Sequence, residues 1–239
     1  MNQLSTRNSE QDDGLRSIRD AFAAAVGETE FPCIMARSAL ANQQLRSMTA
    51  GHMACPNNDR AILDFLYEFI DEFKKAGAGY HSAVIIFDQP VETTETLFEQ
   101  LFWQRLQALA DLDARNFGYD KRVSADPMSE NFSFSLKEEA FYIIGLHPAS
   151  SRKARRFSHP AIVFNPHAQF EALRAANKYD KIKQVIRKRD LQYSGSVNPM
   201  LKDFGTATEA FQYSGNKYDD QWKCPLHIKH EPNEHHPPA

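Results

Sequence analysis

The sequence predicts an α+β fold, a single domain in which a small mixed β-sheet of about four strands packs with several helices. Two patterns predict it. Short aromatic and β-branched runs, bounded by Gly, Pro, Asn or Asp, indicate strands over 82–87, 132–136, 141–146 and 161–164. Apolar residues that recur every three or four positions indicate helices between them. No Pro- or Gly-rich linker divides the chain, so we expect one domain.

The helices are expected near 15–26, 33–45, 59–77, 94–109 and 168–190. Residues 1–14 are polar and lack periodicity, which predicts a flexible N-terminus. The folded domain is expected over 15–226. Residues 227–239 are rich in Pro and His, and we expect a disordered C-terminal tail there.

The composition is that of an ordinary globular protein, with 42% hydrophobic and 25% charged residues in 239. A formal net charge of -3 gives no general attraction to nucleic acid or to an anionic membrane. The sequence contains no apolar run long enough to span a membrane, and its polar start differs from a signal peptide. Three cysteines, an odd number, favour free thiols in a reducing compartment. We therefore expect a cytoplasmic protein that binds neither nucleic acid nor membrane.

The stretch 141–167 carries most of the candidate site. Its two strands are separated by fourteen residues, from His147 to Pro160, in which Ser150 or Ser151 can cap a helix. That length suits a helical crossover, so the strands are predicted to be parallel neighbours. Their carboxyl ends would then meet at the same edge of the sheet.

Polar residues would gather at that edge, which is where open α/β sheets bind ligands. A helix N-terminus and guanidinium groups both attract anions, so we expect an anionic ligand. The alternative is that the arginines form a solvated helix face and the histidines only end the strands. The residues expected at the edge are His147, Ser150, Ser151, Arg152, Arg155, Arg156, Asn165 and His167.

Cys33 is expected in the first turn of the second helix. There the helix dipole would lower the pKa of the thiol and favour a role as metal ligand or nucleophile. The alternative is an inert packing residue. His52 and Cys55 form a single pair without a second one, so we interpret them as structural. The irregular segments 193–201 and 212–215 are expected to cover or line a binding site.

Several motifs resemble the YqcI/YcgG family, and the likeness spans roughly residues 31–226. The most specific is Gly145-Leu146-His147-Pro148, followed by the Ser-Ser-Arg of 150–152. One departure is Leu226, where the family pattern suggests an aromatic residue. The matching stretches are 31–33, 145–152, 154–157, 160–161, 164–167, 169–171, 198–201, 203–205, 212–215 and 222–225.

The resemblance implies an enzyme with a haem cofactor. Some members look like haem-dependent monooxygenases, which N-hydroxylate the guanidine of arginine or an arginine-like amino acid in natural-product biosynthesis. Thiolate ligation favours O–O bond cleavage, so Cys33 is the first candidate for the iron ligand. His147 is its rival, and Cys224 is a third candidate.

Other roles follow from the same resemblance. Arg152, Arg155 and Arg156, with Ser151 at the helix start, would hold the haem propionates, and His167 would be a catalytic acid. A guanidine substrate needs an acidic partner, for which Asp88, Glu138 and Glu139 lie near strand ends, while Tyr213 or Trp103 could pack on the guanidinium. No flavin or iron–sulfur motif is visible, so electrons or peroxide must come from an external donor.

Two other functions remain open. The chain could be a non-catalytic haem or small-anion binding protein, such as a sensor, or an enzyme that binds a phosphate ligand at the Ser-Ser-Arg segment without haem. The sequence also leaves open whether the protein forms a homodimer.

Overall fold

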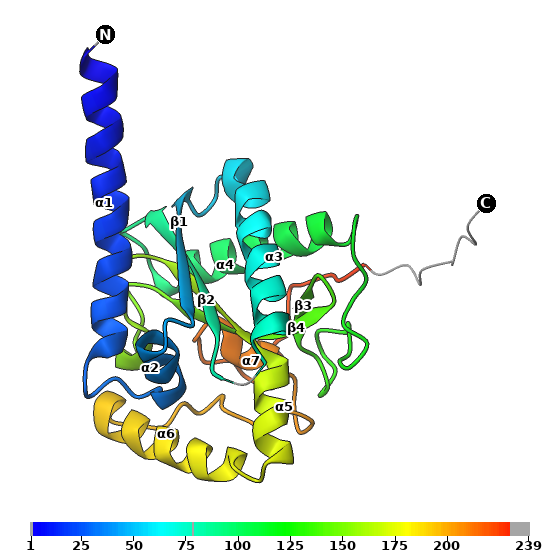
Figure 1. Cartoon of the computed structure of the whole chain (residues 1–239). Helices are drawn as coiled ribbons and strands as arrows, with labels where there is room; N and C mark the ends of the chain where they lie inside the picture. The colour runs from blue at the N-terminus through cyan, green and yellow to red at the C-terminus, as the bar shows by residue number, and fades with distance from the viewer. Residues whose placement is uncertain (1, 78, 230–239) are drawn as a thin grey trace, which may run out of the picture.

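A five-stranded mixed sheet forms the centre of the molecule (Figure 1). The computed structural model describes residues 2–77 and 79–229, with side chains from residue 13 onward. The strand order is β1-β2-β5-β4-β3. The strands are β1 (Leu45–His52), β2 (Ser82–Gln89), β3 (Phe134–Leu136), β4 (Glu139–Leu146) and β5 (Ala161–Pro166). The predicted α+β class is confirmed, with one strand more than expected.

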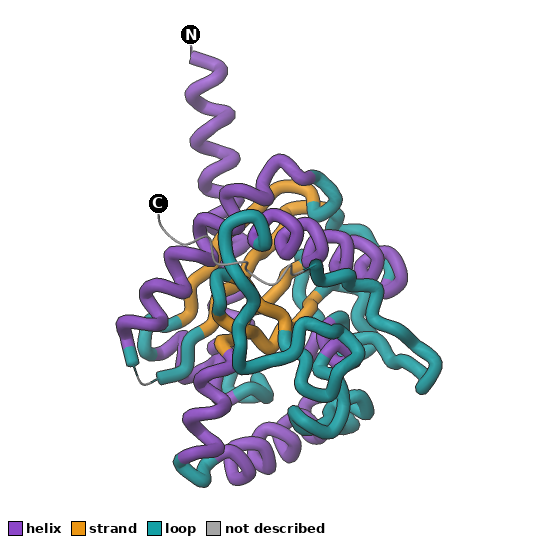
Figure 2. Tube along the Cα trace, turned by 90° about the vertical axis from the view of Figure 1, so that its right-hand side faces the viewer, coloured by secondary structure: helices purple, strands orange, loops and turns teal. Residues whose placement is uncertain are grey.

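Helices cover both faces of this sheet, as Figures 1 and 2 show. Helices α3 and α4 lie on one side of the sheet, and α1 and α2 lie on the other. Helix α6 runs across the end of the molecule below α2 (Figure 1). The helices are α1 (Asn2–Gly27), α2 (Ile34–Ala41), α3 (Asp59–Ala76), α4 (Glu95–Asp113), α5 (His167–Ala175), α6 (Tyr179–Ser194) and the short α7 (Ala210–Tyr213). Over residues 2–77 and 79–229, no helix has the length and apolar character needed to cross a bilayer.

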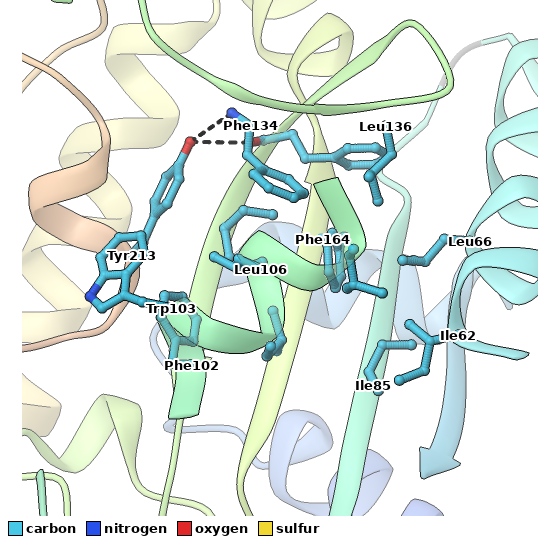
Figure 3. Close-up of a cluster of buried hydrophobic side chains, with 14 of the residues drawn as sticks. Ile62, Leu66, Ile85, Phe102, Trp103, Leu106, Phe134, Leu136, Phe164 and Tyr213 are labelled. Atoms are coloured by element: carbon cyan, nitrogen blue, oxygen red, sulfur yellow. Dashed lines mark hydrogen bonds between the residues drawn. The ribbon is translucent and has the colours of Figure 1, made fainter. Parts of the chain in front are cut away.

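The alternation of side chains along the strands divides the core in two. In β2, Ile85 and Phe87 join α3 and α4 in the larger core, while Val84 and Ile86 face α1 in the smaller one. Figure 3 shows the larger core, where Tyr213 of α7 points its hydroxyl at the backbone of Phe134. Each face of the sheet therefore has its own hydrophobic core.

Local signals explain several elements. Thr94 caps α4 by accepting a hydrogen bond from Leu97 N at 3.1 Å. The turn between β3 and β4 has positive φ at Lys137 (48°) and Glu138 (57°), as a two-residue hairpin of the primed type requires. Both the strand 82–87 and the hairpin were predicted from sequence, and both are confirmed.

The prediction that β4 and β5 are parallel neighbours is wrong. They pair antiparallel, with Leu146 opposite Ala161 and Phe141 opposite Pro166. The connection between them holds only a 3₁₀ turn, Lys153–Arg155, instead of the expected α-helix. The carboxyl ends of the two strands therefore lie at opposite ends of the sheet, and the common edge expected for His147 and His167 does not exist.

Three further boundaries differ from the prediction. Strand β1 (Leu45–His52) occupies residues that were partly assigned to the second helix. The single helix expected over 168–190 is two helices, separated at Asn177 by a positive φ of 55°. Helix α1 begins at Asn2, well before the expected start at Leu15.

The C-terminal boundary also changes slightly. The backbone of His227 exchanges two hydrogen bonds with the side chain of Gln107. The described chain thus remains attached past residue 226. Residues 230–239 of the expected tail, with His230, His235 and His236, lie outside the described residues.

Candidate functional site

A large cavity lies on the face of the sheet opposite α3 and α4. Its volume is about 260 Å³. The sheet forms its floor, and α1, α2, α5, α6 and the segment 198–212 contribute its walls. The apolar lining includes Phe22, Val26, Phe31, Met35, Val84, Ile144, Leu146 and Val163. Cavities of this kind, largely apolar with a few polar groups, are where proteins bind small molecules and cofactors.

Cys33 lies in the wall of this cavity. It is the N-cap of α2, and its Sγ accepts a hydrogen bond from Ala36 N at 3.4 Å. The expected position at the start of the second helix is confirmed. The expected effect on the thiol is not, because burial raises the pKa of Cys33 more than the backbone N–H groups of Ala36 and Met35 lower it. In the protein without a metal, Cys33 is therefore a protonated thiol.

One end of the cavity is polar. Asn165 accepts a hydrogen bond from Ser82 Oγ at 2.7 Å and donates to the carbonyl of Tyr142 at 3.1 Å. The hydroxyl of Tyr142 donates to Gln212 Oε1 at 2.6 Å. These residues lie in the lining, and their mutual bonds give this end of the cavity a fixed polar surface.

Glu209 is the acidic group of the polar end. It is 5% exposed, lines the cavity, and accepts hydrogen bonds at Oε2 from Ser133 (3.0 Å) and Tyr213 (3.2 Å). Burial raises its pKa to about 8, although both of these hydrogen bonds act in the opposite direction. The carboxyl is therefore mostly protonated at neutral pH. Sequence reasoning missed Glu209; the only hint was its position just before the 212–215 segment.

His167 lies directly behind Glu209, at the start of α5. Its Nδ1 is 3.8 Å from Glu209 Oε1, and its Nε2 is 3.0 Å from Glu171 Oε1. The ring is 3% exposed and contacts Phe204, with 4.5 Å between ring centroids. Burial lowers the pKa of His167, with Glu171 opposing the shift, so the imidazole is neutral at pH 7. The structure thus brings one predicted site residue, His167, next to an unpredicted one.

His147 lies on the other side of the sheet from the cavity. Its ring stacks on Phe98 of α4, with centroids 4.2 Å apart and a 20° angle between planes. It is 1% exposed, and burial lowers its pKa to about 4. Because Cys33 lines the cavity and His147 packs under α4, they cannot both ligate one iron. The edge that His147 was expected to share with His167 is excluded because β4 and β5 are antiparallel.

The predicted anion-binding arginines are occupied within the protein. Arg155 is 8% exposed and donates to the carbonyls of Gly145, Gln212 and Tyr213. Arg156 binds the carbonyls of Ser150 and Ser151. The segment is a turn, so the expected helix N-terminus is absent. The arginines instead hold the turn against the sheet.

The other two predicted anchors, Arg152 and Ser151, lie in different places. Arg152 lines the cavity, although its guanidinium pairs with Asp190 at 2.7 Å. Ser151 is exposed, and its N–H donates to Glu95 Oε1 at 2.8 Å, on the α4 side. Of the four predicted anchors, only Arg152 and Arg155 border the cavity.

Basic residues also line the cavity. Lys183 pairs with Asp180 and Asp203, and Arg187 lies 3.8 Å from Asp203. Arg174 binds Glu171 and places its guanidinium carbon 4.4 Å from the ring centroid of Tyr179. Together with Arg152, Arg155 and Lys202, these cations outnumber the lining carboxylates Asp190, Asp203 and Glu209. The cavity lining therefore carries more cationic than anionic side chains.

The remaining candidates lie elsewhere. Cys224, Trp103 and Tyr213 belong to the core on the α3 and α4 side. Glu139 is paired with Arg122 at 3.0 Å, and neither Asp88 nor Glu138 lines the cavity. Within residues 2–77 and 79–229, no group of three His, Cys, Asp or Glu side chains is arranged to hold a metal ion.

The fold and the cavity define a class of protein: a single α+β domain in which one of the two helix-covered faces of the sheet borders a ligand-sized cavity. The chain belongs to the YqcI/YcgG family, whose profile matches residues 22–227.

Two curated relatives come from Bacillus subtilis (strain 168), and both are named as uncharacterized proteins. YcgG is 28% identical over 182 residues, which cover 73% of this chain and 71% of the relative. YqcI is 28% identical over 185 residues, which cover 74% and 72%. No solved structure matches this chain.

Proposed function

We propose that this protein is a haem-dependent monooxygenase that N-hydroxylates the guanidine group of arginine or an arginine-like amino acid. The observation that carries the proposal is the placement of Cys33, a thiol at a helix start in the wall of a mostly apolar cavity. The resemblance of the chain's motifs to haem-dependent N-hydroxylases supports the choice of cofactor.

The residues around the cavity fit a haem. Its apolar floor and walls would suit a porphyrin, and Cys33 would supply the ligand to the iron. The cationic residues in the lining would suit two propionates. Lys183, Arg187 and Lys202, with Arg152, would hold these carboxylates in place of the arginines that the turn uses.

Bound haem would supply an iron that activates oxygen, with the thiolate donor favouring O–O cleavage. The role of Cys33 is to give up its proton when the metal binds, because a coordinating thiol is deprotonated outright. The N–H of Ala36 then continues to donate to the sulfur and limits its charge. The residues of α1 and α2 keep bulk water away from the cavity floor.

Protons and electrons would come from different sources. His167 and Glu209, buried at the polar end, can hold or release a proton beside the substrate. We expect reducing equivalents from an external donor, or peroxide in their place.

The test is an absorption spectrum of protein produced with a haem precursor, recorded oxidised, reduced, and reduced with carbon monoxide. We expect a Soret band at one haem per chain and a strongly red-shifted carbon monoxide complex, both lost in Cys33→Ser. The control is Cys224→Ser, which changes a cysteine in the opposite core and should keep the spectrum. An unaltered spectrum in Cys33→Ser, or no haem in the wild type, would contradict the proposal.

A second candidate is a non-catalytic haem or small-anion binding protein. The excess of cationic over anionic side chains in the cavity lining favours it, because these cations suit an anion more directly than they suit oxygen chemistry. Arginine, reductant and oxygen added to the haem-loaded protein distinguish the two. A product one oxygen atom heavier than arginine supports the enzyme, and its absence supports the binding protein.

A further inference from the structure

Glu209 is unusual among the carboxylates that line the cavity. Asp190 pairs with Arg152 and accepts a hydrogen bond from Ser194 Oγ at 3.0 Å. Asp203 pairs with Lys183. Glu209 lies deeper, and the hydrogen bonds from Ser133 and Tyr213 both reach its Oε2. Its Oε1 is left facing His167.

His167 cannot satisfy that oxygen in its neutral form. When Nε2 carries the hydrogen and donates it to Glu171, Nδ1 is an acceptor. Nδ1 is buried and has no hydrogen-bond partner among the described residues. It lies 3.8 Å from Oε1, so two acceptor atoms face each other across a short gap whenever the carboxyl of Glu209 is ionised. Buried polar atoms without partners are rare in folded proteins, and Nδ1 and the ionised carboxylate can be satisfied by the proton of a neutral carboxyl or by a ligand rich in N–H donors.

The surroundings select among donor-rich ligands. Aromatic side chains of Tyr142, Phe170 and Phe204 are part of the lining near this end. Planar cations such as guanidinium and amidinium pack on aromatic faces and place paired N–H groups against a carboxylate. An ammonium ion lacks this planar geometry. Shape and hydrogen bonding therefore favour a guanidinium.

The charged groups described near Glu209 do not pair with its ionised carboxylate. Arg174 on α5 lowers the pKa of Glu209, but its guanidinium is paired with Glu171, which acts in the opposite direction. The groups on the other packed elements, Ser133 and Tyr213, are neutral donors. A cation of matching shape is missing from the described residues around Oε1.

We propose that Glu209 is the specificity-determining residue of this cavity, and that its Oε1 binds the guanidinium of the substrate, with His167 positioned behind it. The proposal rests on the proposed function for the identity of the substrate. Binding exchanges one cation for one proton: the carboxyl of Glu209 loses its proton to solvent as the guanidinium pairs with the carboxylate. His167 stays neutral in this exchange.

The experiment compares L-arginine with L-citrulline, a neutral analogue in which a urea replaces the guanidinium. Affinities are measured by calorimetry on the full chain, as purified and after haem loading, for the wild type and Glu209→Gln. We expect the wild type to prefer arginine by at least about tenfold, and Glu209→Gln to lose most of this preference, because the amide cannot pair with a cation.

The control is Glu99→Gln, which makes the same chemical change in α4. Both oxygens of Glu99 are occupied by Asn216 and Tyr218, and we expect the preference for arginine to be kept. If Glu209→Gln fails to fold, Glu209→Asp retains the charge but shortens the side chain, and we expect it to lower arginine affinity more than citrulline affinity. A purely structural carboxyl would leave the arginine-to-citrulline ratio unchanged in both variants.

The outcomes separate this inference from the proposed function. An unchanged ratio in the Glu209 variants, or no arginine binding by the wild type, overturns the inference. Arginine binding that depends on Glu209 in a protein that takes up no haem supports the inference while the oxygenase fails. Arginine hydroxylation with the same ratio in wild type and Glu209→Gln supports the oxygenase while the inference fails.

Discussion

Replacing Arg155 with Met should destabilise the protein far more than the same change at Arg156. The sequence suggested that both arginines bind a cofactor, yet the structure uses them differently. Arg155 is buried and donates to Gly145 O (3.1 Å), Tyr213 O (3.2 Å) and Gln212 O (2.8 Å). Its guanidinium thereby ties α7 to the end of β4.

The expected loss follows from these contacts. A hydrogen bond from a charged donor contributes about 1.5–3 kcal/mol, and a buried carbonyl left without a partner costs about 1–3 kcal/mol. Burial of the charged guanidinium is unfavourable in itself and lowers the pKa of Arg155. The substitution removes this cost together with the hydrogen bonds. We therefore expect a net loss of about 3–5 kcal/mol, within the range for breaking a buried charged network.

Arg156→Met is the matched control. Arg156 binds the carbonyls of Ser150 and Ser151 within its own turn, and its loss should cost about 0.5–1.5 kcal/mol. Urea unfolding followed by far-UV circular dichroism measures the difference. With a slope of about 3 kcal/mol per molar, the midpoint of Arg155→Met should fall by about 1–1.7 M.

The two possible roles of Arg155 give different results. Equal midpoints for the two variants would refute the reasoning from the three carbonyls. So would an unchanged midpoint with lost haem binding, because that result would mean that Arg155 serves the cofactor and not the fold.

Two further predictions concern the α4 side of the sheet. A Cβ at Gly145 would lie 3.0 Å from ring carbons of Phe98, so Gly145→Ala should destabilise by about 1–3 kcal/mol in the same urea assay. Gly14→Ala in α1 meets nothing within 4 Å and should stabilise by about 0.5–1 kcal/mol; similar effects of the two changes would contradict the packing argument. The pKa of His147 is lowered from 6.5 to about 4, so its contribution is fully present above pH 6.5 and is lost progressively as the pH falls from 6.5 to 4. This loss totals about 3 kcal/mol, with about 2 kcal/mol between pH 7 and 5, and His147→Phe should flatten it. A wild-type slope retained in His147→Phe would assign the acid sensitivity to other groups.

Much of the local structure could be predicted from sequence because its signals are local. The apolar run at 82–87 becomes β2, the periodic residues after Asp59 become α3, and Lys137 with Glu138 forms the hairpin turn. The position of Cys33 at a helix start also follows from its neighbours. Strand β1 was missed because its burial pattern is mostly intermediate, without the alternation that marks a half-buried strand.

The site depends on contacts between distant parts of the chain. Fourteen residues between β4 and β5 allow either a crossover or a folded turn, and Arg155 and Arg156 stabilise the turn by binding carbonyls that no local pattern reveals. That choice makes the strands antiparallel and moves His147 away from His167. The raised pKa of Cys33 likewise follows from burial, which outweighs the local helix start.

The amino-acid sequence by itself determined the α+β class, most of the helices and strands, and the motifs that place the chain in its family. It did so because the period of apolar residues and the turn residues act over a few positions. Only the tertiary structure decided which sheet face carries the cavity, that Cys33 and His147 lie on opposite sides, and that Glu209 meets His167. Strand pairing and burial are set by contacts between residues far apart in the chain, and a single sequence does not display them.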